Sequence, residues 1–302
     1  MAPNPTRMKK ELHSSTGAAP SPRRRQRAAV GSQAVRLVTV AVYVAVAAAF
    51  LLPVFWMVST SLKQPNEVFS LPIQWLPKHI SFENYPQALG AYDFKRYIAN
   101  SFIVTTIATV AQVSLASAAG FGLAKYRFRG RHLLLIAILS TIMLPIEVLM
   151  VPLYQMFSVI GWQNSYQGLI LPLIADAFGV FLMRQFMLDI PDELLDAARL
   201  DGASELGIFF RIALPLSWPA IATLAIFVWR EAWDDFVWPY VIISDDLHRT
   251  IPLGVALFSQ SELTNYGQLM AIATLATIPP AIVFLLFQRK VVRSIALTGL
   301  KG

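Results

Sequence analysis

The chain has 302 residues, of which 56% are hydrophobic and 14% are charged, and its formal net charge is +7. This composition excludes an ordinary water-soluble domain and predicts an all-α membrane protein. The sequence contains no cysteine, which excludes disulfides and thiolate metal sites.

Residues 1–34 are rich in Pro, Ser, Ala and Arg and lack periodic apolar positions. We expect them to form a disordered basic tail on the cytoplasmic side, followed by one transmembrane domain over residues 35–302. The positive charge of the tail favours anionic membrane lipid as a partner. It does not favour nucleic acid, because no aromatic platform accompanies the charge.

Six transmembrane helices are expected, three of them from uncharged runs at 37–61, 97–124 and 263–288. Each run exceeds the roughly 20 residues that a spanning helix needs. Three further spans are interrupted by charge: Glu147 within 133–157, Asp176 within 165–183, and a charged cluster within 212–240.

The placement of lysine and arginine predicts the orientation of these spans. With the N-terminus in the cytoplasm, most of the 25 lysines and arginines fall in cytoplasmic segments, as the positive-inside rule requires. Both termini and the polar segment at about 188–214 are then cytoplasmic.

The polar segment that separates two apolar spans is the most informative part of the chain. Pro191 suits a first helical turn and Asp192 and Glu193 suit a helix N-terminus, which predicts a helix over 192–200. Gly202 is expected to end this helix in the left-handed conformation. Ser204 is expected to cap a second helix that leads toward residues 214 and 215.

Small and apolar side chains on this helical turn favour a contact with another protein. Ala197 and Ala198 permit close approach, and Leu194, Leu195 and Leu206 supply apolar contacts. The alternative is an ordinary polar loop that returns the chain to the membrane.

Charged residues inside the spans are candidates for a transport pathway, since ionisable groups in hydrocarbon usually face protein or water. Glu147 follows Pro145 and Asp176 follows Pro172, and both could line a wet cavity. Alternatively, each hydrogen-bonds a neighbouring span and only fixes packing.

A second cluster near the end of the fifth predicted span combines aromatic and charged side chains. One hypothesis places these residues beside a water-filled pathway, with aromatic faces stacking on the rings of a ligand and charges bonding its hydroxyls or an anionic substituent. The other is an ion pair at the outer membrane interface beside aromatic-belt tryptophans. The cluster comprises Trp229, Arg230, Glu231, Trp233, Asp234 and Asp235, with Trp238 as a third tryptophan.

Motifs for catalysis are missing from the sequence. It contains no G-x-x-x-x-G-K-[ST] phosphate loop and no H-E-x-x-H pair, and Trp238 and Arg249 stand where a D-D-x-x-D motif needs its last acid. We therefore expect no catalytic residue, metal or cofactor.

The polar segment resembles the coupling loop of permease subunits in binding-protein-dependent ABC importers. The family pattern E-A-A, Gly, I-x-L-P is matched, with Asp in place of Glu, by Asp196, Ala197, Ala198, Gly202, Ile212, Leu214 and Pro215. The resemblance implies that Asp196 pairs with a basic residue of an ATPase subunit, that the two alanines make the close contact, and that Glu193 belongs to the same surface.

Further motifs resemble MalG-like permeases of carbohydrate uptake: NSFIVTT from Asn100, YRFRGR from Tyr126, FLMRQFMLDIP from Phe181, WDDFVWPYVIISD from Trp233, TIPLGVALF from Thr250 and FLLFQRKVVRSIALTGLKG from Phe284. This likeness implies a type I ABC importer permease fold in a bacterial inner membrane, in which the chain forms half of the translocation pathway.

The implied partners are a homologous second permease, two cytoplasmic ATP-binding subunits or domains, and an extracellular sugar-binding protein. The substrate class stays open among sugars, polyols and glycerol-phosphate esters. A non-transporting membrane scaffold or receptor subunit would have the same topology and is the alternative function.

Overall fold

The computed structural model describes residues 22–260 and 265–299, and the side chains of 35–260 and 265–288. The chain divides into two compact units, Met1–Trp56 and Met57–Gly302. Every regular element in the described ranges is helical, which confirms the all-α prediction.

The described helices follow one another along the chain. In order they are α2 (Pro22–Ser61), α3 (Pro65–Val68), α4 (Asn84–Ala91), α5 (Phe94–Lys125), α6 (Arg131–Ser140), η1 (Thr141–Met143), α7 (Ile146–Val159), α8 (Tyr166–Ile170), η2 (Leu171–Leu173), α9 (Ala177–Leu188), α10 (Asp192–Leu200), α11 (Glu205–Ile208), η3 (Phe209–Ala213), α12 (Leu214–Leu216), α13 (Trp218–Asp234), α14 (Val237–Ile242), α15 (Ile251–Ser259) and α16 (Tyr266–Gly299).

Helix α2 begins at Pro22, inside the tail for which we expected disorder. Residues 1–21 lie outside the described residues. The apolar part of α2, Val35–Ser61, is long enough to cross a membrane, as the sequence predicts.

Within the described residues, three helices are long and apolar enough to span a membrane, namely Val35–Ser61, Phe94–Lys125 and Tyr266–Gln288, and three bent helix pairs bring the number to six if each pair is one span. The pairs are Arg131–Met143 with Ile146–Val159, Tyr166–Leu173 with Ala177–Leu188, and Glu205–Leu216 with Trp218–Asp234. They bend by 101°, 46° and 77°. Proline accounts for the sharpest break, because Pro145 lacks a backbone N–H and stands in extended conformation just before α7.

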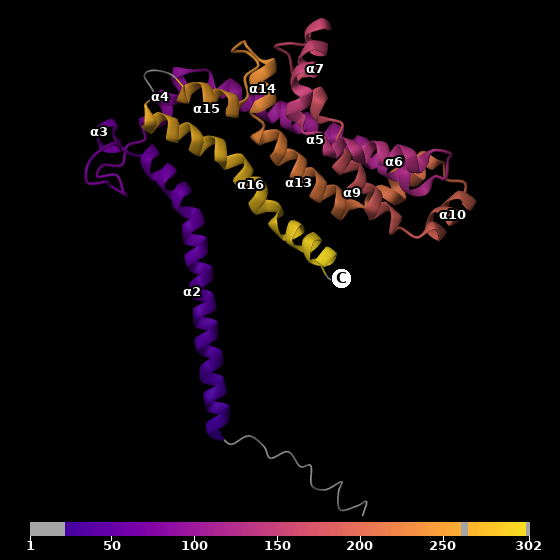
Figure 1. The fold of residues 1–302 in the computed structure, drawn as a ribbon, viewed down its shortest axis with the longest axis horizontal. Helices are drawn as coiled ribbons and strands as arrows, with labels where there is room; N and C mark the ends of the chain where they lie inside the picture. Colours follow the sequence, from indigo (N-terminus) through magenta and orange to yellow (C-terminus); the bar gives the residue numbers. More distant parts are fainter. Residues whose placement is uncertain (1–21, 261–264, 300–302) are drawn as a thin grey trace, which may run out of the picture. The chain divides into compact units, whose positions relative to one another are not determined.

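Helix α5 is the central element of the second unit. It packs along α9 and α13, and α13 in turn packs along α16 (Figure 1). The largest core cluster lies between α5, α9 and the segment that follows α9, and includes Phe121, Met183, Met187, Ile208 and Leu224. Helix α10 lies at one end of this bundle, and α4 and α15 lie at the other (Figure 1).

Gly120 permits the close approach of α5 and α9. A Cβ at this position would lie 2.8 Å from the Cβ of Met183 and 2.8 Å from the backbone nitrogen of Arg184. Gly122, one residue further on, faces open space. Gly120 is therefore a packing residue and Gly122 is not.

Candidate functional site

The polar segment folds as the sequence predicts at its turn. Helix α10 runs Asp192–Leu200, and Gly202 adopts the left-handed conformation with φ of 83°. The Ser204 hydroxyl oxygen accepts a hydrogen bond from the Gly207 N–H at 3.2 Å and so caps α11. The structure confirms these three local predictions. They could be made from the sequence because each depends only on residues that are neighbours along the chain.

The leucines of the segment divide between the core and the surface. Leu195 is 1% exposed and belongs to the core cluster, whereas Leu194 and Leu206 are 49% and 71% exposed. Of the three apolar contacts expected for a partner, only Leu194 and Leu206 are available. Leu195 holds α10 against the bundle instead.

The two alanines also differ in their surroundings. Ala197 is exposed, whereas Ala198 is half-buried and packs against the core cluster. A partner can approach Ala197 freely, but a large side chain at position 198 would disturb packing as well as docking.

Arg199 joins the two short helices through two carboxylates. Its Nη1 donates to Asp196 Oδ1 at 2.7 Å, and its Nε donates to Glu205 Oε1 at 2.8 Å. The Tyr126 hydroxyl donates to Glu205 Oε2 at 2.6 Å, which connects this network to the residue that follows α5.

These bonds change the acidity of their members. The hydrogen bond from Arg199, with that from Tyr126, lowers the pKa of Glu205. Burial, together with the hydrogen bond to Glu205, raises the pKa of Tyr126 to about 12. Both groups therefore keep their bonded protonation states at neutral pH.

A second connection fixes the start of α10 to the end of α5. The Lys125 ammonium donates to Asp192 Oδ1 at 2.6 Å and also to the Ile190 carbonyl oxygen. The Lys125 side chain is 4% exposed and that of Asp192 is 71% exposed. The hydrogen bond from Lys125 lowers the pKa of Asp192.

The other residues expected at the coupling surface flank this centre. Glu193 is exposed in the first turn of α10, and Pro215 is exposed in α12. Ile212 and Leu214 pack against the core cluster, and Ile212 lies within the π-helical turn η3. A π-helical turn widens the helix, and such turns are frequent at functional sites.

Sequence reasoning missed four residues of this site: Lys125, Tyr126, Arg199 and Glu205. The pairing of Arg199 with Glu205 had a signal, because opposite charges flank the predicted turn at Gly202. Lys125 and Asp192 are separated by 67 residues, and only the packing of α9 back along α5 brings them together.

The charged residues predicted inside the spans occupy separate places. Asp176 is the N-cap of α9, and its Oδ2 accepts from the Gly179 N–H at 2.7 Å. This bond is local to α9 and is not the hydrogen bond to a neighbouring span that was the alternative to a pathway role. Glu147 is exposed in the first turn of α7 and forms no ion pair within the described part of the chain.

The charges of the second cluster lie along α13. Arg230 forms an ion pair with Asp234 at 3.3 Å, and these side chains are 70% and 50% exposed. Glu231 is exposed next to them. Asp235 has a local role, since its Oδ1 accepts from the Trp238 N–H at 3.4 Å at the start of α14.

The tryptophans of this cluster are stacked on each other. The ring centroids of Trp229 and Trp233 are 5.1 Å apart with an interplanar angle of 13°. Trp233 is 2% exposed, contacts Phe102, and donates its Nε1–H to the Ala276 carbonyl oxygen at 3.1 Å. This position favours packing for Trp233, whereas half-buried Trp229 keeps part of its ring accessible.

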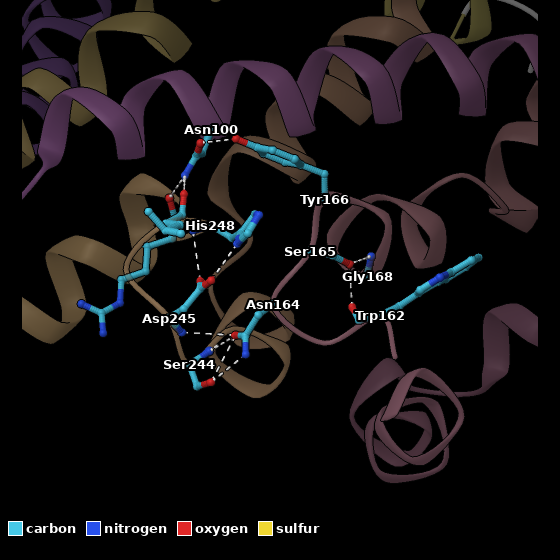
Figure 2. A network of polar contacts seen from close by, with 11 residues as sticks. Asn100, Trp162, Asn164, Ser165, Tyr166, Gly168, Ser244, Asp245 and His248 are labelled. Carbon is cyan, nitrogen blue, oxygen red and sulfur yellow. Dashed lines mark hydrogen bonds and ion pairs between the residues drawn. The ribbon is translucent and has the colours of Figure 1, made fainter. Parts of the chain in front are cut away.

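A polar network at the opposite end of α5 holds the loop between α14 and α15 (Figure 2). The Asn100 Nδ2 donates to the carbonyl oxygens of Leu247 and Arg249 at 2.8 Å each, and its Oδ1 accepts from the Tyr166 hydroxyl at 2.6 Å. The neighbouring Ser101 Oγ accepts from the Ile251 N–H at 2.8 Å. The motifs that begin at Asn100 and Thr250 therefore meet in space.

Asn164 fixes the other side of the same loop. Its Oδ1 accepts from the backbone N–H of Ser244 at 2.6 Å and of Asp245 at 3.2 Å. Asp245 in turn contacts the His248 ring at 2.8 Å (Figure 2). This loop is therefore held at both flanks by amide side chains.

Comparison with known proteins finds a matching family model and several relatives. A family model described as "Binding-protein-dependent transport system inner membrane component" matches residues 112–297. The arabinooligosaccharides transport system permease protein AraQ of Bacillus subtilis strain 168 is 34% identical over 256 residues, covering 84% of this chain and 91% of AraQ.

Another relative is the sn-glycerol-3-phosphate transport system permease protein UgpE of Pectobacterium atrosepticum, 34% identical over 238 residues, covering 76% of this chain and 85% of UgpE. A solved chain from a bacterial ABC transporter involved in the import of the acidic polysaccharide alginate superposes with a TM-score of 0.75 at 26% identity. That match covers 86% of this chain and 97% of the solved one.

Proposed function

We propose a transport function from the premise that the chain belongs to the family of binding-protein-dependent transport system inner membrane components. It acts as a permease subunit of an ATP-driven importer, with residues 35–302 as the transmembrane domain. The relatives named for arabinooligosaccharides and sn-glycerol-3-phosphate support a sugar or polyol derivative as substrate. The substrate would then be a molecule with one or more hydroxyl-rich rings or chains, and it would cross the membrane beside this subunit.

The proposed orientation places α10, α11 and both termini in the cytoplasm. Its support is the concentration of basic residues at the end of the bundle that carries α10, because such residues accumulate on the cytoplasmic side. These residues are Lys125, Arg127, Arg129, Arg131, Arg184, Arg199 and Arg211.

The segment from α10 to α11 is proposed to dock on a cytoplasmic ATPase subunit. The observation that carries this proposal is its double attachment to α5, through Lys125 to Asp192 and through Tyr126 to Glu205. A partner that moves the segment must also move the end of the central helix. ATP hydrolysis is assigned to two such subunits, since this chain has no phosphate loop.

Asp196 can take part in docking without leaving its internal partner. Its side chain is 66% exposed while it accepts from Arg199. A carboxylate has more acceptor sites than this one bond uses, so a basic residue of the ATPase can bind the same group. Ala197, Glu193 and Leu206 provide the surrounding contact surface.

The pathway is proposed to be completed by a homologous permease and supplied by an extracellular binding protein. Glu147, Arg230, Glu231 and Asp234 are exposed polar groups suited to hydroxyls, and Trp229 offers part of an aromatic face.

Reconstitution tests the function directly. The chain is co-purified with its neighbouring subunits and placed in liposomes, and ATP-driven uptake is measured from a panel of carbohydrates and glycerol-phosphate esters. The test variant is Ala197→Arg, which changes an exposed position, and the matched control is Ala91→Arg at the opposite end of the bundle.

We expect Ala197→Arg to abolish both uptake and co-purification of the ATPase while Ala91→Arg retains both. Uptake and ATPase association that survive Ala197→Arg would contradict the docking role. A wild-type complex that takes up no member of the panel would favour the scaffold alternative.

A further inference from the structure

We propose that a basic cavity beside the N-terminus of α6 binds the phosphate-bearing headgroup of an anionic phospholipid. The cavity has a volume of about 430 Å³ and is lined by Phe128, Gly130, Arg131, His132, Leu135 and Arg184. A second hollow of about 480 Å³ shares Phe128 and Arg131 and adds Arg127 and Arg129.

The two arginines that line the first cavity have no acidic partner in the part of the chain described by the structure. Arg131 donates to the Tyr126 carbonyl oxygen at 3.3 Å, and Arg184 donates to the Leu123 carbonyl oxygen at 3.3 Å. Arg184 also contacts the Gln185 amide oxygen at 3.4 Å. These neutral acceptors leave both positive charges uncompensated.

Both arginines line the same cavity, so their guanidinium groups bring two positive charges to one site. Like charges at the edge of one cavity repel each other, and an anion bound between them would offset this repulsion. Lys125 and Arg199, at the same end of the bundle, each pair with a carboxylate. Unlike Lys125 and Arg199, the two cavity arginines form no ion pair within the described residues.

The apolar surroundings identify the anion as a lipid headgroup. In the first turns of α6, next to the cavity, Leu133, Leu134 and Ile136 are 72%, 46% and 50% exposed. Acyl chains can cover these side chains while the phosphate enters the cavity, whereas a free phosphate ion would leave them uncovered. The helix N-terminus adds a positive dipole end toward the same headgroup.

The cytoplasmic leaflet supplies such lipids, and basic pockets between transmembrane helices on that side bind anionic headgroups. In this respect the inference rests on the orientation proposed above. It does not depend on the identity of the transported substrate or on the contact with the ATPase.

The test measures phospholipid that stays bound to the full complex. The complex is incubated in detergent with phosphatidylglycerol or phosphatidylcholine, and the lipid retained after washing is counted by native mass spectrometry. The test variants are Arg131→Gln, Arg184→Gln and their combination. Arg211→Gln is the matched control, because Arg211 is exposed in the polar segment and does not line the cavity.

We expect wild type to retain phosphatidylglycerol and not phosphatidylcholine. The affinity of the complex for phosphatidylglycerol should fall roughly fivefold for each arginine removed and remain unchanged in Arg211→Gln. Arg131→Lys with Arg184→Lys keeps the charge and should retain more lipid than the double glutamine variant, which separates charge loss from misfolding.

Equal retention by wild type and the double glutamine variant would overturn the proposal. Displacement of phosphatidylglycerol by millimolar inorganic phosphate would also overturn it, in favour of a free-anion site. If the wild-type complex retained phosphatidylglycerol but took up no substrate, the result would count against the proposed transport function and not against the lipid site.

Discussion

The ammonium nitrogen of Lys125, the last residue of α5, lies 2.6 Å from the carboxylate of Asp192, the first residue of α10. Helix α5 is the central helix of the bundle, and α10 begins the segment proposed to dock on the ATPase. This pair therefore joins the docking segment to the element that contacts most of the bundle.

Removing this connection should weaken the coupling of ATP hydrolysis to transport. Lys125→Met is expected to keep the ATPase bound but to lower the substrate transported per ATP hydrolysed by roughly fivefold or more, because the bond from Tyr126 to Glu205 is then the one polar attachment left of the two described above. Uptake and phosphate release measured in the same liposomes give this ratio.

The matched control is Arg96→Met, which removes the exposed ion pair with Asp93 at the other end of α5. Exposed pairs of this kind contribute little, so coupling should be unaffected. If the Lys125→Met complex transported as much substrate per ATP hydrolysed as wild type, the pair of Lys125 with Asp192 would not be required for coupling.

The carboxylate of Glu205 should make the docking segment sensitive to acid. Hydrogen bonds from Arg199 and Tyr126 lower the pKa of Glu205 below its ordinary value of 4.5. A lowered acid pKa means that the stabilisation is complete above pH 4.5 and is lost as pH falls through the lower folded-state value. Hydrogen exchange of residues 196–208, corrected for the intrinsic rate, should show protection that is constant from pH 7 to pH 5 and decreases below.

Glu205→Gln should lack this acid-dependent step and show low protection at every pH. Glu193→Gln, on the exposed first turn of α10, should retain it. An identical pH profile in wild type and Glu205→Gln would mean that this carboxylate does not order the segment.

Gly120 should tolerate no side chain. In Gly120→Ala the new Cβ would lie 2.8 Å from atoms of α9, so we expect a loss of about 1–3 kcal/mol in the free energy of unfolding. Thermal unfolding in detergent measures this effect. Gly122→Ala places its Cβ in open space and should be neutral or slightly stabilising, because alanine favours helix. Equal melting temperatures for both variants would contradict the close packing of α5 and α9.

The two asparagines that hold the loop before α15 should respond differently to the same substitution. Asn100→Asp removes the donor that serves two carbonyl oxygens and should cost about 1–3 kcal/mol of stability. Asn164→Asp keeps the oxygen that accepts from two backbone N–H groups and should cost less. Melting temperatures compare the variants, and a larger loss in Asn164→Asp would contradict these assignments.

Local chemistry made part of this structure predictable. The span of α10, the left-handed Gly202 and the Ser204 cap each follow from residues within one turn of each other. Composition and run length likewise predicted the all-α class and the segments able to cross a membrane.

Long-range packing determines other features, namely which side chains are buried and which distant residues meet, and local sequence patterns do not predict these. Leu194 and Leu195 are equally apolar, and only the docking of α10 on the bundle determines that Leu195 is the buried one. The Lys125 pair crosses 67 residues, so no local pattern could indicate it. Trp233 and Asp235 were candidates for the pathway by residue type, but their hydrogen bonds to Ala276 and Trp238 became visible only in the fold.

Cross-linking shows directly whether the segment from α10 to α11 contacts the ATPase. The chain has no cysteine, so a single introduced cysteine is the one thiol that this subunit contributes to the complex. The complex carrying Ala197→Cys is treated with a short thiol-to-amine cross-linker and compared with Gln87→Cys at the opposite end of the bundle. We predict a covalent product with the ATPase subunit from position 197 and none from position 87. A product from position 87, or none from position 197 in a complex that still transports, would contradict docking of the ATPase on this segment.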